Sequence, residues 1–584
     1  MTPRYMLFVC ALAPVPVPVR APAQGTPLDA FRANIAAIHA RDRAAYLSHY
    51  LQSPSFARVG PGGIALGYDA FVRGQTDSWP DTLIATQLEV VPITPDVAYG
   101  AYRYRVVTGG ESDRGVSERV FVRTPAGWKV AVTTAFSTPG AAPPPLALVG
   151  ATLLDGTGSA AVRDAVVVMR EGRIACAGPR AACPVPADAH TVDATRQWII
   201  PGLVDAHVHF SQTGWVDGRP DALDLRATRP YEQVVAELAR GTERLFRSYL
   251  CSGVTSVFDV GGYPWTWDLE QRTATSTRAP RVRAAGPLLS TIDFWLNLPG
   301  ERQFIYMADS QTVRQAVRAH RARGAAAIKI WYIMSRDVDT ARVSALVHAA
   351  GDEARRVGLP LIVHATGLWE AKDALRAGAA LLVHSVVTDS VDAEFLRLAR
   401  QRGTVYTPTL VVSDGYVQVA ARRFARERQP LECVDPETRA RALATDTVAP
   451  DRRPTDEQLR ARIARRDRQF AQMLANLKRV HDAGIPVALG TDAGNPLTLH
   501  GAAVFMELEA MQAAGLTPMQ VLVAATRNGA RALGLDSTGT VTAGAVADLV
   551  VLDADPVSDI ANVRRIALVV RRGEVYTRRE LEWR

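Results

Sequence analysis

The chain has 584 residues, of which 48% are hydrophobic and 22% are charged. This length predicts two or three domains, and the composition is typical of an ordinary globular protein. The net charge of +8 comes from scattered basic residues, without a basic arm or an RNA-binding aromatic motif, and no apolar run reaches the roughly 20 residues that span a bilayer. We therefore expect neither nucleic-acid binding nor stable membrane insertion.

Residues 1–23 have the features of a secretory signal. Arg4 gives a positive start, YMLFVCALAPV is apolar, and Ala21-Pro22-Ala23 fits a small-x-small cleavage site. The prolines at positions 14, 16 and 18 are untypical of such a segment. We expect a periplasmic or secreted protein.

Four cysteines would remain after cleavage. Cys176 and Cys183 flank a turn-like stretch and could close a small disulfide loop in an oxidising compartment. The default interpretation of Cys251 and Cys433 is that they are structural or unpaired thiols.

Residues 24–138 predict an α+β domain. LDAFRANIAAIHARDRAAYLSHY has helical apolar spacing, and Gly67 opens another short helix. Alternating strands follow in TQLEVVPITP, VAYGAYRYRVVTG, GVSERVFVRT and GWKVAVTTAFS. This order resembles the cone-shaped SnoaL-like fold of the nuclear-transport-factor-2 superfamily. The resemblance implies a ligand-binding or dimerisation module and hence a homo-oligomer.

Residues 139–145 are a proline-rich linker, and short strands follow over residues 146–201. Matching strands stand at the far end of the chain, over residues 539–584. Between them, over residues 202–538, strands alternate with helical stretches as a (β/α)8 TIM barrel requires. We place its strands at 203–209, 254–260, 281–285, 326–331, 360–364, 380–384, 404–409 and 486–491. The largely helical, Arg-rich segment near residues 411–480 does not fit a minimal barrel; its Arg422, Arg423 or Arg426 could meet a substrate carboxylate or lie on a solvated face.

Polar residues stand at the ends of several of these apolar strands. His207 and His209, in PGLVDAHVH, are two apart and therefore project together from one strand. Lys329 lies in AAAIKIWY, His364 in LPLIVHATG, His384 in ALLVHSV and Asp492 in IPVALGTDAG. Catalytic groups of such barrels sit at the C-terminal ends of the strands, so these six residues predict a two-metal hydrolytic site.

Lys329 is unusual because only four of the 67 basic residues are lysines. Burial in an apolar strand favours the neutral amine, which can react with carbon dioxide. The resulting carbamate could bridge two metals, whereas guanidinium could not. The alternative is a core lysine paired with a nearby carboxylate.

These five motifs, in this order, resemble the amidohydrolase superfamily, with the closest likeness to its secreted imidazolonepropionase- and prolidase-like members. The stretch from GTDAGNPLTLH to ARALGL and the tail GTVTAGAVADLVVLDADPVSDI add to the resemblance, which covers roughly residues 146–584. It implies that residues 146–201 and 539–584 combine into one discontinuous β-sandwich domain. Imidazolonepropionases use one metal and lack the bridging lysine, so Lys329 points to the prolidase-like binuclear branch.

The resemblance also implies which residues hold each ion, for which we expect Zn²⁺. His207, His209 and Asp492 would hold the more buried metal, His364 and His384 the second, and carbamylated Lys329 would bridge both. Asp492 would in addition take a proton from the shared water and pass it to the leaving nitrogen.

Other candidates come from the neighbouring residues. Tyr332 could donate to the tetrahedral oxyanion or merely line the pocket, and His500 could orient substrate or support Asp492. We also place Tyr406 and Thr409 near the pocket and interpret Asp205 as a structural partner of the first ligands.

The leading functional prediction is a metal-dependent amidohydrolase that cleaves dipeptides, Xaa-Pro first, or N-acyl amino acids. A cyclic amide, a lactone or a phosphoester is the alternative substrate, since the same chemistry attacks each. A different class, a SnoaL-like ligand-binding protein with an inactive barrel, also remains open.

Overall fold

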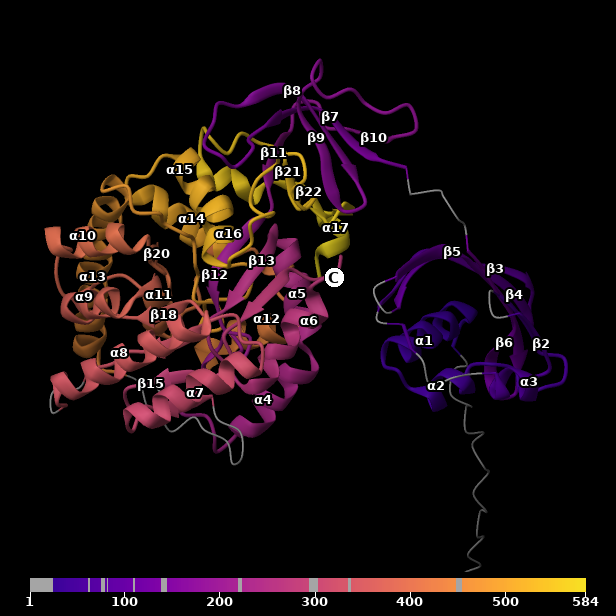
Figure 1. Ribbon diagram of the computed structural model, residues 1–584, viewed down its shortest axis with the longest axis horizontal. Helices are drawn as coiled ribbons and strands as arrows, with labels where there is room; N and C mark the ends of the chain where they lie inside the picture. The colour runs from indigo at the N-terminus through magenta and orange to yellow at the C-terminus, as the bar shows by residue number, and fades with distance from the viewer. Residues whose placement is uncertain are drawn as a thin grey trace, which may run out of the picture. The chain divides into compact units, whose positions relative to one another are not determined.

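The computed structural model describes residues 25–60, 63–74, 79–80, 82–108, 111–137, 144–218, 223–293, 303–334, 338–447 and 454–583. The predicted signal segment and residues 139–143 of the predicted linker lie outside the described residues. The chain divides into two compact units, Met1–Ala142 and Pro143–Arg584. Figure 1 shows both units.

The first unit is built on one six-stranded sheet with the order β2-β1-β6-β5-β4-β3. Its long strands pair antiparallel in chain order, and β1 joins β6 in parallel. The strands are β1 (Ala57–Gly60), β2 (Gly63–Leu66), β3 (Thr82–Thr94), β4 (Val97–Thr108), β5 (Glu111–Thr124) and β6 (Gly127–Ser137). The sequence pattern missed β1 and β2, which are only four residues long.

Three helices accompany this sheet: α1 (Pro27–His39), α2 (Arg43–Ser48) and α3 (Tyr68–Arg73). α1 begins at a capping box in which Thr26 and Asp29 satisfy each other's backbone N–H groups. The predicted single helix is two helices because the Asp42 side chain caps the start of α2. The buried positions of α1 are Phe31, Asn34 and Ala37, which lie on one face.

An eight-stranded sheet of the second unit unites two distant parts of the chain. Its order is β23-β22-β21-β11-β7-β8-β9, with β10 paired to β7. The antiparallel pairing of β11 with β21 joins the two parts. The strands are β7 (Leu146–Leu153), β8 (Val162–Arg170), β9 (Arg173–Pro179), β10 (His190–Asp193), β11 (Trp198–Pro201), β21 (Leu549–Leu552), β22 (Ile566–Arg571) and β23 (Glu574–Thr577).

Parallel strands occupy the centre of the second unit. One sheet has the order β12-β13-β14 and another has the order β16-β15-β17-β18-β19-β20. β12 and β13 are buried along their whole length, as continuous apolar runs predict. These strands are β12 (Leu203–Val208), β13 (Val254–Asp259), β14 (Arg281–Ala284), β15 (Leu288–Ser290), β16 (Phe304–Tyr306), β17 (Ile328–Trp331), β18 (Leu361–His364), β19 (Ala379–Val383) and β20 (Val405–Thr407).

The segment predicted as the eighth barrel strand, residues 486–491, is not a regular strand. Val487 forms an isolated parallel bridge with Tyr406 of β20. On its other side, the backbone N–H of Ala206 in β12 donates to the carbonyl of Leu489 over 2.9 Å. The segment therefore lies between β20 and β12.

Helices follow most of the parallel strands and lie outside them in Figure 1. α8 ends at Gly358, whose left-handed φ of 72° a residue with a side chain rarely adopts. The helices are α4 (Tyr231–Arg240), α5 (Thr242–Cys251), α6 (Asp268–Thr273), α7 (Ser310–Ala322), α8 (Thr340–Val357), α9 (Leu368–Ala377), α10 (Ala393–Arg402), α14 (Val504–Ala513), α15 (Pro518–Val523), α16 (Gly529–Ala532) and α17 (Arg578–Leu581), with short turns η1 (Val216–Gly218), η2 (Pro264–Trp267), η7 (Ala524–Asn528, a π-helix) and η8 (Ile560–Arg564).

A helical insertion follows β20. It consists of α11 (Val412–Ala421), η3 (Arg426–Arg428), η4 (Leu431–Cys433), α12 (Pro436–Leu443), η5 (Ala444–Thr447) and α13 (Asp456–Asp482). The longest of these helices is α13, which has 27 residues and is rich in arginine. Within the part of the chain that the structure describes, no helix combines the length and the apolar character needed to cross a membrane.

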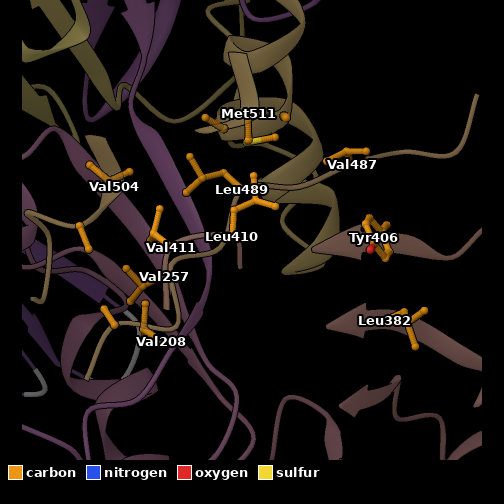
Figure 2. Packing of buried hydrophobic residues seen from close by; sticks show 14 of the residues in the cluster. Val208, Val257, Leu382, Tyr406, Leu410, Val411, Val487, Leu489, Val504 and Met511 are labelled. Carbon is orange, nitrogen blue, oxygen red and sulfur yellow. The ribbon is translucent and has the colours of Figure 1, made fainter. Parts of the chain in front are cut away.

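The parallel strands rest on a large apolar core. Figure 2 shows part of it, with Val208 of β12, Leu410, Leu489 and two residues of α14, Val504 and Met511, all in one buried cluster. Such close packing holds the strand ends, and with them the side chains that follow, in fixed positions.

Two disulfides are present among the described residues. Cys176 and Cys183 are bonded, seven residues apart, and Cys251 and Cys433 are bonded across 182 residues. The interpretation of Cys251 and Cys433 as structural or unpaired thiols is therefore corrected. Their pairing ties α5 to the helical insertion, two segments that only the fold brings together.

Candidate active site

The two histidines of β12 point to one place. His207 lies within the strand, His209 follows it, and both are buried. Because they are two residues apart in an extended segment, their rings share a side, and the two Nε2 atoms lie 3.3 Å apart. The Nδ1 atom of His209 donates to the carbonyl of Gly261 over 2.7 Å. This bond leaves the lone pair of His209 Nε2 directed into the site.

Asp492 completes a triangle with these two rings. Its Oδ1 atom lies 3.2 Å from Nε2 of His207 and 3.2 Å from Nε2 of His209. The residue is buried and has a left-handed φ of 60°, and its backbone N–H donates to the carbonyl of His207. Three donor atoms from two distant chain segments thus lie within hydrogen-bond distance of one another.

This triangle fits a divalent metal ion. Imidazole nitrogen and carboxylate oxygen are ordinary zinc ligands, and these three atoms lie close enough together that they could hold one ion. Asp492 Oδ1 is buried and accepts no hydrogen bond from the described residues. Burial lowers the pKa of His207 to about 3, which keeps that imidazole neutral, as a metal ligand must be.

His384 extends the cluster. Its ring centroid lies 4.8 Å from that of His207 and 4.3 Å from that of His364, which ends β18. Its Nδ1 atom lies 2.7 Å from the hydroxyl of Thr409 and 3.8 Å from Oδ2 of Asp492. The predicted position of Thr409 near the pocket therefore agrees with the structure.

Lys329 lies in the same cluster as these histidines and Asp492. It is buried in β17, and burial lowers the pKa of its amine to about 7, although Asp492 and Asp259 raise it. A cavity of about 410 Å³ is lined by Lys329 together with His209, His364, His384 and Asp492, while His207 is fully buried against His209 and Asp492. The structure thus gathers all six predicted ligands at one end of the parallel strands.

Acidic residues behind the site position its loops. Asp205 accepts from the backbone N–H groups of His207 and Thr491 and from the Thr491 hydroxyl. Asp259, at the end of β13, accepts from the backbone N–H groups of Phe210 and Gly261. Asp205 therefore has the structural role expected of it; Asp259 was overlooked, although VFDVGG places an acid at a strand end.

Tyr332 does not face the cavity, which corrects its predicted role as an oxyanion donor. Its hydroxyl donates to Oδ2 of Asp373 in α9 over 3.0 Å. Lys329 and Trp331 line the cavity, so strand alternation turns Tyr332 to the opposite side, toward the helices.

His500 is likewise removed from the cavity. Its Nε2 atom donates to the carbonyl of Gln212, and its Nδ1 atom accepts from the hydroxyl of Tyr249. The ring stacks on Phe210 at an interplanar angle of 6°. These contacts correct its predicted catalytic role: His500 supports the loop after β12. Tyr406 is also buried, packs against Phe395 and lies outside the cavity lining.

The helical insertion supplies part of the cavity wall. Tyr416 of α11, with Arg465, Gln469 and Met473 of α13, lines it. Arg422 instead lines an adjoining hollow of about 450 Å³. The sequence offered Arg422, Arg423 or Arg426 for a substrate carboxylate, with a solvated face as the alternative, whereas Arg465 lines the cavity.

Most of the second unit is similar to known enzymes. Residues 198–576 match the amidohydrolase family. An imidazolonepropionase of Mesorhizobium japonicum is 28% identical over an alignment of 436 positions, and the match covers 69% of this chain and 90% of the relative. An ochratoxinase of Aspergillus niger is 27% identical over an alignment of 440 positions, and the match covers 70% of this chain and 81% of the relative.

Solved structures share the fold of the same region. The structure of a Bifidobacterium longum protein assigned as a prolidase has a TM-score of 0.55 and 25% identity, and it covers 75% of this chain and 95% of that chain. A Xaa-Pro dipeptidase with bound methionine has a TM-score of 0.55 at 21% identity, covering 74% of this chain and 100% of that chain. At that identity the second similarity bears on the fold alone.

Proposed function

Because this chain belongs to the amidohydrolase family, we propose that it is a metal-dependent hydrolase that cleaves carbon–nitrogen bonds of small amide substrates. The observation that carries this proposal is the triangle of His207, His209 and Asp492, whose donor atoms lie 3.2–3.3 Å apart. Neutral imidazoles and a carboxylate in a buried cavity are the ligands of catalytic zinc sites.

We propose a closed (β/α)8 barrel as the scaffold. Besides the ladders of the two parallel sheets, the backbone N–H of Ala326, just before β17, donates to the carbonyl of Ala284 in β14. On the other edge, residues 486–491 lie between β20 and β12. These contacts support a continuous ring of eight segments, with all six ligands at the C-terminal ends of the strands. For the first unit, the proposed fold is the SnoaL-like cone.

Two divalent ions are the proposed cofactors, and Zn²⁺ is the first candidate. His207, His209 and Asp492 would hold one ion, His364 and His384 the other, and Lys329, once carbamylated, would bridge both. In carbamylation the neutral amine of Lys329 attacks carbon dioxide and loses a proton; its burial and lowered pKa support this step. Ions bound in this way polarise a carbonyl and lower the pKa of a coordinated water.

Asp492 is the proposed proton carrier. Oδ1 lies in the ligand triangle, while Oδ2 lies 3.8 Å from His384, so the carboxylate extends between the two sets of ligands. It would take a proton from the attacking water and deliver it to the leaving nitrogen, which must be protonated before it departs.

We propose that the substrates are dipeptides, with Xaa-Pro dipeptides as the first candidate, or N-acyl amino acids. The similarity to an ochratoxinase and to a protein assigned as a prolidase supports this class. The imidazolonepropionase relatives favour a cyclic amide as the second candidate. Arg465 on the cavity wall provides a cation for a substrate carboxylate.

The test is a substrate screen with the purified, metal-loaded protein. Dipeptides, N-acyl amino acids, cyclic amides, lactones and phosphoesters are compared with Asp492→Asn as the matched inactive variant. Turnover of an amide that depends on Asp492 supports the proposal. Absence of turnover of every amide, or equal turnover by the variant, contradicts it.

We also propose a periplasmic or secreted location and a homo-oligomer formed through the first unit. Two disulfides among the described residues support an oxidising compartment, because such bonds seldom persist in the cytosol. Blocking each cysteine before and after reduction, followed by mass measurement of protein from its natural source, tests the location. Light scattering tests the oligomer.

A further inference from the structure

The first unit contains a buried cation at a position where its sheet should carry an apolar residue. Along β5, Gly115, Ser117, Arg119 and Phe121 alternate toward the core, and Arg119 is only 3% exposed. Its direct neighbour on β4 is Gly100. Because glycine has no side chain, the rings of Phe31 and Phe121 pack directly over β4 at this point, where a Cβ atom would lie 3.2 and 3.1 Å from them.

Aromatic rings and one amide surround this guanidinium. Its Cζ atom lies 4.7 Å from the ring centroid of Phe31 and 5.1 Å from that of Tyr102. Nη1 donates to Oδ1 of Asn34 over 2.5 Å, and Nη2 donates to the hydroxyl of Tyr102 over 3.2 Å. Asn34 is itself fully buried on the inner face of α1. Two polar residues on separate elements thus interrupt apolar stripes and meet in the core.

No carboxylate balances this charge among the described residues. Arg571, the other buried arginine of the described chain, shows the ordinary arrangement, since its Nη1 donates to both oxygens of Asp548 over 2.9 and 2.8 Å. Arg119 has neutral acceptors only, which is costly for a buried ion. Two buried donors nearby, Nε of Arg119 and Nδ2 of Asn34, also have no acceptor within the described part of the chain.

We propose that the core of the first unit binds a small organic monocarboxylate at Arg119 and Asn34. A carboxylate supplies the single negative charge that the guanidinium lacks, and its two oxygens match the planar donor edge of arginine. Nδ2 of Asn34 offers a further donor, and the rings of Phe31 and Tyr102 provide apolar walls for the body of the ligand. This site is independent of the function proposed for the second unit.

The test is calorimetric titration of the full-length protein with acetate, propionate and benzoate at constant ionic strength. The corresponding amides serve as uncharged probes of the same shape. Arg119→Met is compared with Arg123→Met, which removes the same side chain from an exposed position of the same strand. Both variants keep the metal ligands, so carboxylate bound in the second unit contributes equally to every titration.

We expect wild type and Arg123→Met to bind one more equivalent of carboxylate than Arg119→Met. The affinity lost with Arg119 should be about 30-fold or more, as for other buried, hydrogen-bonded ion pairs. Identical titrations of all three proteins overturn the proposal, as does equal binding of the amides. If Arg119→Met fails to fold, Arg119→Lys replaces it, because lysine keeps the charge but loses the fork; full wild-type affinity in that variant overturns the proposal as well.

Discussion

Oδ1 of Asp492 lies 3.2 Å from Nε2 of His207, although 285 residues separate them in the chain. The backbone bond from Asp492 N–H to the carbonyl of His207 brings them together. Asp205 holds the neighbouring turn by accepting from His207 and Thr491. The carboxylate is therefore held against the imidazole by the main chain as well as by its own side chain.

Asp492→Asn should lower kcat by about 100- to 10,000-fold, since the amide cannot accept a proton from water. Metal content should fall much less, because the amide oxygen and the two imidazoles of the triangle remain. Metal analysis and steady-state kinetics on one preparation check both. Unchanged turnover would rule out the proton role.

Removal of metal should abolish activity reversibly. Dialysis against a chelator is expected to lower Tm as well, because ions that bind only the folded state stabilise it. Zn²⁺, Mn²⁺ or Co²⁺ should restore both properties. Full activity in protein that retains no measurable metal would exclude a metal-dependent reaction.

Lys329→Met should leave one ion bound and remove most activity, because methionine cannot form the bridging carbamate. Lys478→Met is the matched control, since Lys478 lies partly exposed on α13, away from the cavity lining, and pairs with Asp482. The metal content per chain distinguishes these two variants. Two full equivalents in Lys329→Met would show that the bridge is not needed.

Tyr332→Phe should keep kcat within about twofold and lose about 1.5–3 kcal/mol of stability, the usual cost of one hydrogen bond to a charged group. The bond at stake is the one to Asp373, which lies among the outer helices. Denaturant unfolding measures the change. A kcat loss of 100-fold without unfolding would return Tyr332 to the active site.

The strand-end ligands could be predicted from sequence because alternation and apolar runs are local patterns. The same alternation argues against Tyr332, since Lys329 and Trp331 already define the inward parity of β17. His500 could not be placed in this way. It lies in an irregular segment after Asp492, where no periodicity states which way a ring points.

Contacts between distant segments were beyond sequence reasoning. The bond between Cys251 and Cys433 spans 182 residues, and cysteine spacing does not determine connectivity. The arginines of the first half of α13 lie on several sides of the helix, so which of them reaches the cavity depends on packing against α11. Predictions for the helical insertion were correspondingly the least specific.

Removing the long-range disulfide should cost more stability than removing the short one. The loop-entropy model gives about 5 kcal/mol for Cys251→Ser with Cys433→Ser, against about 2 kcal/mol for Cys176→Ser with Cys183→Ser. Both bonds close loops, but of 182 and seven residues. Unfolding of each double variant in denaturant gives the comparison, and the reverse order would contradict the model.

Anomalous X-ray diffraction from crystals of the zinc-loaded enzyme tests the metal centre most directly. Two peaks are expected about 3.5–4 Å apart, one of them within about 2.2 Å of the His207, His209 and Asp492 ligand atoms, with carbamate density joining Lys329 to both. A single peak with an unmodified Lys329, or no peak beside Asp492, would contradict the binuclear site.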